Sequence, residues 1–179
     1  KITDKVIKPN ERIVPDSATE ITSDTGQMFR NWKLGYGWVD TDNTKAAYGF
    51  VGRAGEIELT GMSILSKTDF ATIALTTLTD KPISKSDNML LTTVGRSENK
   101  DMKFNANHSV LTDFGSAPSM IEIIDATIKI KTDVTGLQVW SISAEGSFYG
   151  KIPAVYADGV LSFRIGEAYP SVFYLIQKA

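Results

Sequence analysis

The chain has 179 residues, of which 42 % are hydrophobic and 22 % charged, and its formal net charge is −2 at pH 7. These values suit one globular domain with a substantial apolar core. No block of like charges points to a nucleic-acid partner. No apolar run approaches the roughly 20 residues of a membrane span, so we also expect no membrane partner. The absence of cysteine excludes disulfides and thiolate chemistry.

Residues 1–21 are expected to form an extended lead-in or linker remnant. They contain Pro9, Pro15 and many charged side chains, which is typical of irregular segments. Because the chain starts at Lys1 rather than at methionine, we expect a module taken from a longer polypeptide. Residues 22–179 are then expected to form one β-sandwich module.

Short runs with β-sheet character follow one another along the rest of the chain. The clearest is DATIKIKTD at residues 125–133, where Ala126, Ile128 and Ile130 alternate with polar residues, as in a strand with one buried face. Threonine, β-branched and aromatic residues, which suit a pleated sheet, dominate the other runs. These are residues 27–29, 46–52, 56–61, 69–79, 88–95, 120–124, 137–143, 160–166 and 171–177.

Turn-forming residues separate these runs. Asp158-Gly159 lies between residues 152–157 and 160–165 and is the strongest hairpin signal in the chain. No sustained helical period occurs. About ten strands separated by frequent turns predict an all-β fold, namely an antiparallel, jelly-roll-like β-sandwich.

Catalysis has little support in the sequence. His108 is the single histidine, and no nucleophile-elbow pattern accompanies it, so we expect it in a loop or at a strand edge rather than in a Ser-His-Asp triad. The 21 acidic residues leave a glycosidase-type carboxylate pair open, but solvated surface is the expected role of each. The protein is therefore predicted not to be an enzyme and to need no cofactor.

Residues 40–44, DTDNT, resemble the start of a calcium-binding loop. Lys45 and Val51 stand where the EF-hand pattern needs glycine and glutamate, so no EF-hand is predicted. A turn rich in Asp and Asn explains the same residues. No metal ligands are therefore predicted, and a structural calcium ion is kept as an alternative.

Aromatic residues gather in NWKLGYGWVD, residues 31–40. In an extended segment Tyr36 and Trp38 project from the same face. Gly35 and Gly37 beside them often mark the close approach of a ligand or of another backbone. Because an aromatic ring offers a flat apolar face to the C–H groups of a sugar ring, we expect Trp38 to lie at the surface and contact a glycan.

The neighbouring polar residues would complete such a site. Lys33, Asp40 and Asp42, together with Asn31, are expected to hydrogen-bond to sugar hydroxyls. For Trp32 the core is slightly favoured over the surface, and this residue is held as a further ligand candidate. The predicted ligand-binding residues are Trp38, Tyr36, Trp32, Lys33, Asp40 and Asp42.

The other large aromatic residues are assigned to packing. Trp140 lies among alternating apolar residues and is expected in the core between the sheets. Phe173 and Tyr174 fall on opposite faces of a strand, so one of the two is expected in the core.

Several phrases resemble an accessory module found at the C-terminal end of bacterial glycoside hydrolases. They are SDTGQMFRNW, GYGWVDTDNTKAAYGFVG, LLTTVGRSENKDMKFN, QVWSISAEGSFYGKIPA and VLSFRIGEAYPSVFYLI, and they span about residues 22–176. The resemblance implies a noncatalytic, secreted, extracellular β-sandwich that is covalently linked to a catalytic domain. In such modules the position of Trp38 is usually smaller and more polar, which favours a ligand role for this tryptophan. Arg96, Glu98 and Asn99 of the VGRSEN phrase are interpreted as a hydrogen-bond network that fixes a loop.

Two functions remain open at this stage. The predicted one is a carbohydrate-binding module that holds the linked enzyme on β-glucan or a related plant cell-wall glycan through surface aromatic residues, which raises its effective concentration. We expect this module to be a monomer whose partner is a polysaccharide or an oligosaccharide. The alternative is a structural domain that packs on the catalytic domain and binds no sugar.

Overall fold

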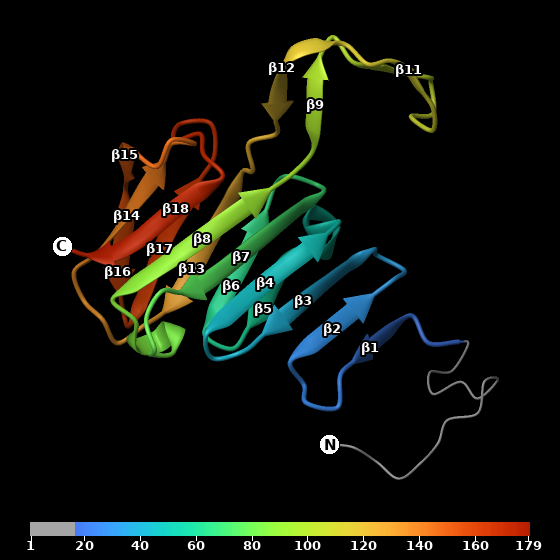
Figure 1. Ribbon diagram of the computed structural model, residues 1–179. Coiled ribbons are helices and arrows are strands. Elements are labelled where there is room, and N and C mark those ends of the chain that lie inside the picture. The colour runs from blue at the N-terminus through green and yellow to red at the C-terminus, as the bar shows by residue number, and fades with distance from the viewer. Residues whose placement is uncertain (1–16) are drawn as a thin grey trace.

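Two antiparallel β-sheets of unequal width form the body of the protein (Figure 1). The computed structural model describes residues 17–179. The predicted all-β sandwich is confirmed, since the two sheets face one another across a buried core. Most of the expected lead-in, residues 1–16, lies outside the described residues, and β1 (Glu20–Thr22) spans its expected boundary. No helix within the described part is long and apolar enough to cross a membrane.

The sheets contain nine and five strands. In spatial order, the wider sheet consists of β1, β2 (Met28–Asn31), β3 (Tyr36–Asp40), β4 (Thr44–Gly49), β7 (Ala71–Thr77), β8 (Asn88–Val94), β18 (Phe173–Lys178), β14 (Leu137–Ile142) and β15 (Phe148–Ile152). The narrower sheet consists of β16 (Ala154–Ala157), β17 (Val160–Ile165), β13 (Ala126–Lys131), β6 (Met62–Ser66) and β5 (Glu56–Leu59). Two short 3₁₀ helices, η1 (Val51–Ala54) and η2 (Ile83–Lys85), lie in connections.

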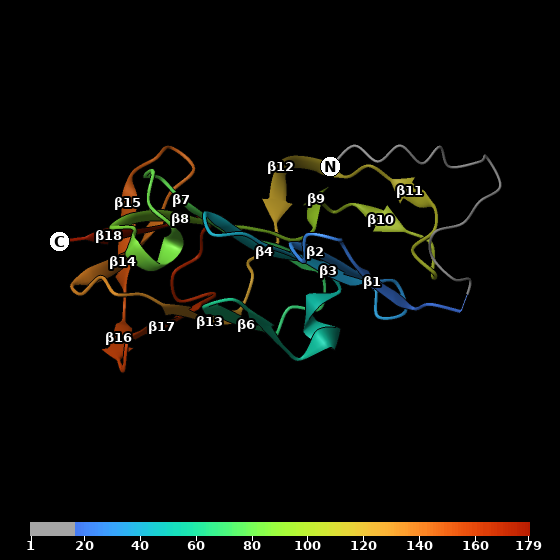
Figure 2. The same ribbon diagram turned by 90° about the horizontal axis from the view of Figure 1, so that it is seen from below.

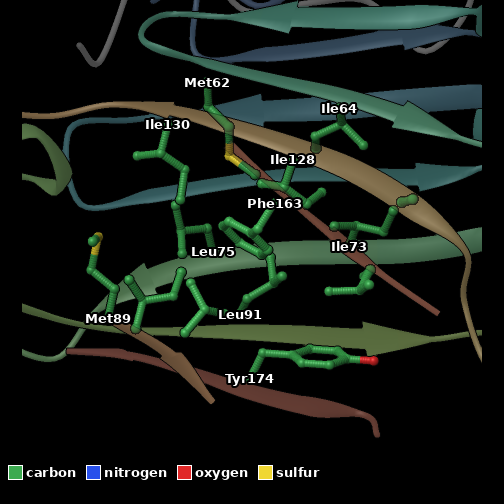
Figure 3. Packing of buried hydrophobic residues seen from close by; sticks show 14 of the residues in the cluster. Met62, Ile64, Ile73, Leu75, Met89, Leu91, Ile128, Ile130, Phe163 and Tyr174 are labelled. Atoms are coloured by element: carbon green, nitrogen blue, oxygen red, sulfur yellow. The ribbon is translucent and has the colours of Figure 1, made fainter. Parts of the chain in front are cut away.

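Period-two alternation builds the core. In β13, Ile128 and Ile130 are fully buried, whereas Lys129 and Lys131 are exposed, as the sequence pattern predicts. Figure 3 shows the side chains of the two sheets packed against each other. Those of the narrower sheet are Met62, Ile64, Ile128, Ile130 and Phe163, and those of the wider sheet are Ile73, Leu75, Met89, Leu91 and Tyr174.

Trp140 is a wrong prediction, because it does not lie between the sheets. Strand β14 turns Leu137 and Val139 into the core, and Trp140 therefore lies on the opposite, outer face, where it is half-buried. There its ring meets the Phe148 ring at a centroid distance of 5.3 Å, and the Lys151 ammonium lies 5.8 Å from the centroid. The alternation along β14 correctly separates its two faces. The inner face, however, is the one that carries Leu137 and Val139 and not the one that carries Trp140.

Two other local predictions are confirmed. Tyr174 is fully buried and donates its hydroxyl to the Ser171 carbonyl at 2.9 Å, and burial raises the pKa of Tyr174 to about 12. Phe173, on the opposite face, is exposed. The Asp158-Gly159 hairpin joins β16 to β17, and both turn residues have positive φ, as a type I′ turn requires.

A β-ribbon, here called the arm, projects from the body between β8 and β13 (Figure 1). It consists of β9 (Ser97–Lys100), β10 (Lys103–Phe104), β11 (Leu111–Asp113) and β12 (Ser116–Ile121). The predicted strand at residues 120–124 is therefore wrong in extent, because β12 ends at Ile121. His108 lies in the exposed turn between β10 and β11, and its ring stacks on that of Phe104.

Part of the predicted VGRSEN network holds the arm together. Arg96 donates through Nε to Glu122 at 3.2 Å, and the Asn99 side chain donates to the Phe114 carbonyl at 3.0 Å. These bonds join the outgoing and returning halves of the arm. Glu98 makes no side-chain hydrogen bond with any residue of the described range.

The core assignment predicts that alanine substitutions of two leucines differ strongly in their effect on stability. Leu91→Ala removes a fully buried side chain and should lower the free energy of unfolding by about 2–5 kcal/mol. Leu65→Ala, at a side chain that is 43 % exposed, should change it much less, by about 0.5 kcal/mol. Urea denaturation of both variants measures the difference, and equal losses would contradict the assigned core.

Candidate functional site

The nine-stranded sheet continues past the edge of the five-stranded sheet at β1, β2 and β3 (Figure 2). We call these three strands the overhang. The strand register decides which of its side chains share a face. Phe29 pairs with Trp38, Trp38 with Ala47, and Ala47 with Ile73. Because Ala47 and Ile73 belong to the buried core, Phe29 and Trp38 point to the same, inner side of the sheet.

This row of side chains passes from the core into solvent. Ile73 and Ala47 are fully buried, Trp38 and Phe29 are half-buried, and Thr22, the partner of Phe29 on β1, is exposed. The rings of Phe29 and Trp38 are stacked, with centroids 5.2 Å apart and planes 14° apart. The apolar row thus continues beyond the strands that the second sheet covers.

Tyr36 extends the aromatic surface along β3. It lies two residues from Trp38 on the same face, as predicted, and its ring is tilted against Phe29 at a centroid distance of 5.7 Å. Burial, and next the charge of Glu20, raise the pKa of Tyr36 above its ordinary value of 10.0. The phenol is a hydrogen-bond donor at neutral pH. Tyr36, Trp38 and Phe29 form what we call the aromatic row.

The expected surface position of Trp38 needs correction. Trp38 does not lie on the outer face of the sheet but on the inner one, where it packs partly against the core and stays half-buried. The inward direction follows from the register with Ala47. Trp38 stays partly exposed because the five-stranded sheet does not reach over β3, against which η1 packs. Phe29, which the sequence analysis did not single out, lies beside it, and only the register of β2 with β3 identifies this neighbour.

The glycines beside these rings are explained by internal packing rather than by a ligand. A Cβ atom at Gly37 would lie 2.6 Å from the Phe29 carbonyl oxygen and 2.6 Å from the Tyr48 hydroxyl of the neighbouring strand. A Cβ atom at Gly35 would lie 2.8 Å from the ring of Phe50. Gly37 therefore requires glycine because a backbone carbonyl and the Tyr48 side chain occupy the space, and Gly35 because of the Phe50 ring and its own positive φ of 78°.

The two tryptophans of the predicted site are separated. Trp32 and Lys33 lie in the turn between β2 and β3, outside the aromatic row, and both are exposed. The slight preference for Trp32 in the core is therefore wrong, since this residue is 44 % exposed. Asn31 is buried, donates to Glu20 at 3.0 Å and accepts from the Leu34 amide at 2.9 Å. It fixes this turn and is not free to meet a sugar.

Asp40 joins the two sheets at the other end of β3. Its carboxylate accepts a hydrogen bond from the largely buried Lys45 ammonium, and its second oxygen accepts one from the Thr60 amide, in the β5–β6 turn, at 2.7 Å. Lys45 also donates to the Thr41 carbonyl at 3.0 Å. Burial alone would raise the pKa of Asp40, but the bonds from Lys45 and Thr60 outweigh it and hold this pKa below its ordinary value.

The six predicted site residues therefore do not form a single cluster. Tyr36 and Trp38 share a face with Asp40, which lies about 13 Å along β3 from Tyr36. Both carboxylate oxygens of Asp40 already have partners, whereas Asp42 is exposed in the following turn. Among residues 17–179, no group of three or more His, Asp or Glu residues is close enough to hold a metal ion. The alternative of a calcium ion bound to residues 40–44 stays an untested prediction.

A scan against protein-family models and searches of curated proteins and solved structures find no match to this chain.

The bond between Asp40 and Lys45 leads to a pH-dependent prediction. Lys45→Met leaves the Asp40 carboxylate buried without its cation, and should cost about 3–5 kcal/mol of unfolding free energy at pH 7. Because the folded pKa of Asp40 is lowered, its contribution is fully present above the ordinary value of 3.8 and is lost as pH falls through the lower, folded pKa. The difference between the parent and Lys45→Met should therefore shrink below about pH 4.

A matched control is the exposed pair of Lys81 and Asp87, whose charged atoms are 3.7 Å apart. Lys81→Met should cost less than about 1 kcal/mol at neutral pH. Urea denaturation of each variant between pH 2.5 and pH 7 measures both effects. Equal costs for the two lysine substitutions, or a Lys45→Met cost that does not change with pH, would contradict the role given to Asp40.

Proposed function

We propose that this chain is a noncatalytic carbohydrate-binding module of a secreted polysaccharide-degrading enzyme. Its ligand would be a β-glucan or a related plant cell-wall glycan, bound along the aromatic row of Phe29, Trp38 and Tyr36. The observation that carries the proposal is the continuation of this row out of the core onto strands that the second sheet does not cover. Binding would keep the linked catalytic domain close to an extended substrate.

The chemistry of the row suits a sugar ring. Phe29, Trp38 and Tyr36 are each partly exposed. Because Phe29 and Trp38 stack on each other, a sugar meets the edges and the remaining faces of these two rings. The C–H groups of a pyranose pack favourably on such surfaces, with a contribution on the order of 1 kcal/mol for each ring contacted. The protonated Tyr36 hydroxyl is able to donate a hydrogen bond to a sugar oxygen at neutral pH. Because the rings belong to paired strands, they are held in place before a ligand binds, and little conformational entropy is lost on association.

The expected affinity is modest. A few partly buried rings on an open sheet offer a small contact area and few directed polar groups. We therefore expect dissociation constants in the range of about 1 μM to 1 mM. Such weak binding is sufficient when the module and the catalytic domain belong to one polypeptide, because attachment raises the local concentration of the enzyme.

A second proposed function is structural, and the arm favours it. Val110, Phe114, Met120 and Ile121 project from this ribbon with large exposed fractions, and Phe114 reaches 75 %. A ribbon of two paired strands is only marginally stable by itself, and exposed apolar side chains on it are typical of a surface that another domain covers. In this alternative the module packs on a glycoside hydrolase catalytic domain and binds no sugar.

Substitutions in the aromatic row test the first proposal. Phe29→Ala and Trp38→Ala should each lower retention on β-glucan affinity gels by tenfold or more, because each removes a ring from the proposed contact surface. Trp38→Phe should keep most of the retention, since it preserves a ring at this position. Gel electrophoresis through immobilised β-glucan measures retention, and circular dichroism checks that each variant is folded.

The matched control is Trp32→Ala. Trp32 is exposed in the β2–β3 turn but lies outside the row, so this variant should be retained like the parent. Loss of retention in Trp32→Ala together with normal retention of folded Trp38→Ala would move the site to the turn. Absence of any retention by the parent would contradict the carbohydrate-binding proposal.

Substitutions in the arm test the second proposal. In a polypeptide that includes a catalytic domain, Phe114→Ser combined with Met120→Ser should lower the inactivation temperature of the enzyme if the arm is covered by that domain. The same changes in the isolated chain should leave its melting temperature nearly unchanged, because both side chains are exposed there. No change of inactivation temperature in the linked protein would contradict the structural alternative.

A further inference from the structure

A polar trough lies at the end of the sandwich where the β3–β4 turn, the β5–β6 turn and η2 come together. It consists of two adjoining hollows of about 340 and 500 Å³ that share Asp42, Lys45 and Thr60 in their walls. The first hollow reaches Lys131 and Asp133, and the second reaches Gln27. Each volume falls in the range of roughly 300–1,000 Å³ that is usual for small-ligand pockets.

The trough lies directly beside the aromatic row. In the register of β2 and β3, the pair of Gln27 and Asp40 follows the pair of Phe29 and Trp38 on the same face. The two pairs are therefore about 7 Å apart along the strands, which is little more than the length of one sugar ring. A chain lying on the rings of Phe29 and Trp38 would reach Gln27 and the second hollow with its next sugar unit.

The walls of the trough are rich in hydrogen-bonding groups. Asp42 and Asp133 make no side-chain hydrogen bond or ion pair with another residue of 17–179. Both carboxylates are therefore available to accept bonds from hydroxyl groups of a ligand. Asn43 and Gln27 add polar side chains along the wall of the second hollow.

The charges of the trough discriminate between classes of glycan. Its walls contain three carboxylates, on Asp40, Asp42 and Asp133, and two ammonium groups, on Lys45 and Lys131. The Lys45 ammonium is already bonded to Asp40 and to the Thr41 carbonyl, so it is not free to pair with an anionic ligand. A sugar carboxylate bound in the trough would therefore lie close to the negative charges of Asp42 and Asp133. The ammonium group of Lys131 would balance only one of these two charges, so the ligand would be repelled.

We propose that this trough binds hydroxyl groups of a neutral oligosaccharide and excludes glycans built from uronic acids, with Asp42 and Asp133 as the residues that accept from the sugar. The proposal rests on the proposed function, because the aromatic row supplies the neighbouring subsite. It deepens that function by assigning the class of glycan and by adding Gln27 and Asp133 to the binding residues. The carboxylates select neutral polyols because hydroxyls donate to them and anions do not.

The test is isothermal titration of the parent chain and its variants with defined oligosaccharides. Cellohexaose, mannohexaose and xylohexaose serve as neutral probes, and hexagalacturonate serves as the anionic probe. The parent should bind at least one neutral probe at least tenfold more tightly than hexagalacturonate. The double variant Asp42→Ala with Asp133→Ala should bind that neutral probe roughly tenfold more weakly or worse, as loss of hydrogen bonds to charged acceptors predicts.

A matched control carries a carboxylate substitution far from the trough. Glu145 is exposed in the turn between β14 and β15, at the opposite end of the sandwich. Glu145→Ala should bind the neutral probe like the parent. Circular dichroism of all variants checks that the fold is kept, and Asp42 and Asp133 are both exposed, so their loss should not unfold the chain.

The outcomes separate this inference from the function it rests on. Neutral-probe binding that depends on Trp38 but is unchanged in the double variant would overturn the trough and leave the proposed function in place. Equal or tighter binding of hexagalacturonate by the parent would overturn the charge argument. Binding of none of the four probes would overturn both proposals.

Discussion

The unequal width of the two sheets is the constraint on which the rest of the structure depends. The five-stranded sheet starts at the same edge as the nine-stranded one, where β15 leads into β16, and ends before β1, β2 and β3 (Figure 2). Along the row from Ala47 on β4 through Trp38 and Phe29 to Thr22, inward-facing positions change from fully buried through half-buried to exposed. The line where the five-stranded sheet ends is therefore a boundary that carries half-buried rings and polar groups. Both the aromatic row and the trough lie at this boundary.

Asp40 shows how the boundary is held. It lies on the same face as Trp38 but pairs with Lys45 and with the Thr60 amide of the other sheet. Removing the charges of Asp40 and Lys45 from water costs free energy. The hydrogen bonds that Asp40 accepts from Lys45 and from the Thr60 amide offset this cost. The result is a fixed distance between the end of β3 and the β5–β6 turn. The aromatic row and the trough meet at Asp40, where this bond joins the two sheets.

The sequence predicted the sheet architecture well, because alternation along β13 and turn chemistry at Asp158-Gly159 are local signals. It also placed Tyr36 and Trp38 on one face. It could not tell which face of β14 is inner because apolar residues occupy both, and this explains the wrong placement of Trp140. The inward direction of Trp38 depends on its register with Ala47 on the next strand. The stacking of Phe29 on Trp38 depends on the pairing of two strands, which no local pattern contains. The same holds for the bond between Asp40 and Thr60, which are 20 residues apart.

The most direct measurement uses the indole N–H signals of the three tryptophans, assigned through Trp→Phe variants. These residues lie in three different environments: Trp32 in an exposed turn, Trp38 in the aromatic row and Trp140 on the outer face. During titration of the ¹⁵N-labelled chain with a soluble β-glucan oligosaccharide, the account predicts a progressive shift of the Trp38 signal while the Trp140 signal stays in place. A shift confined to Trp32 or Trp140, or no shift of any indole signal at millimolar ligand, would contradict it.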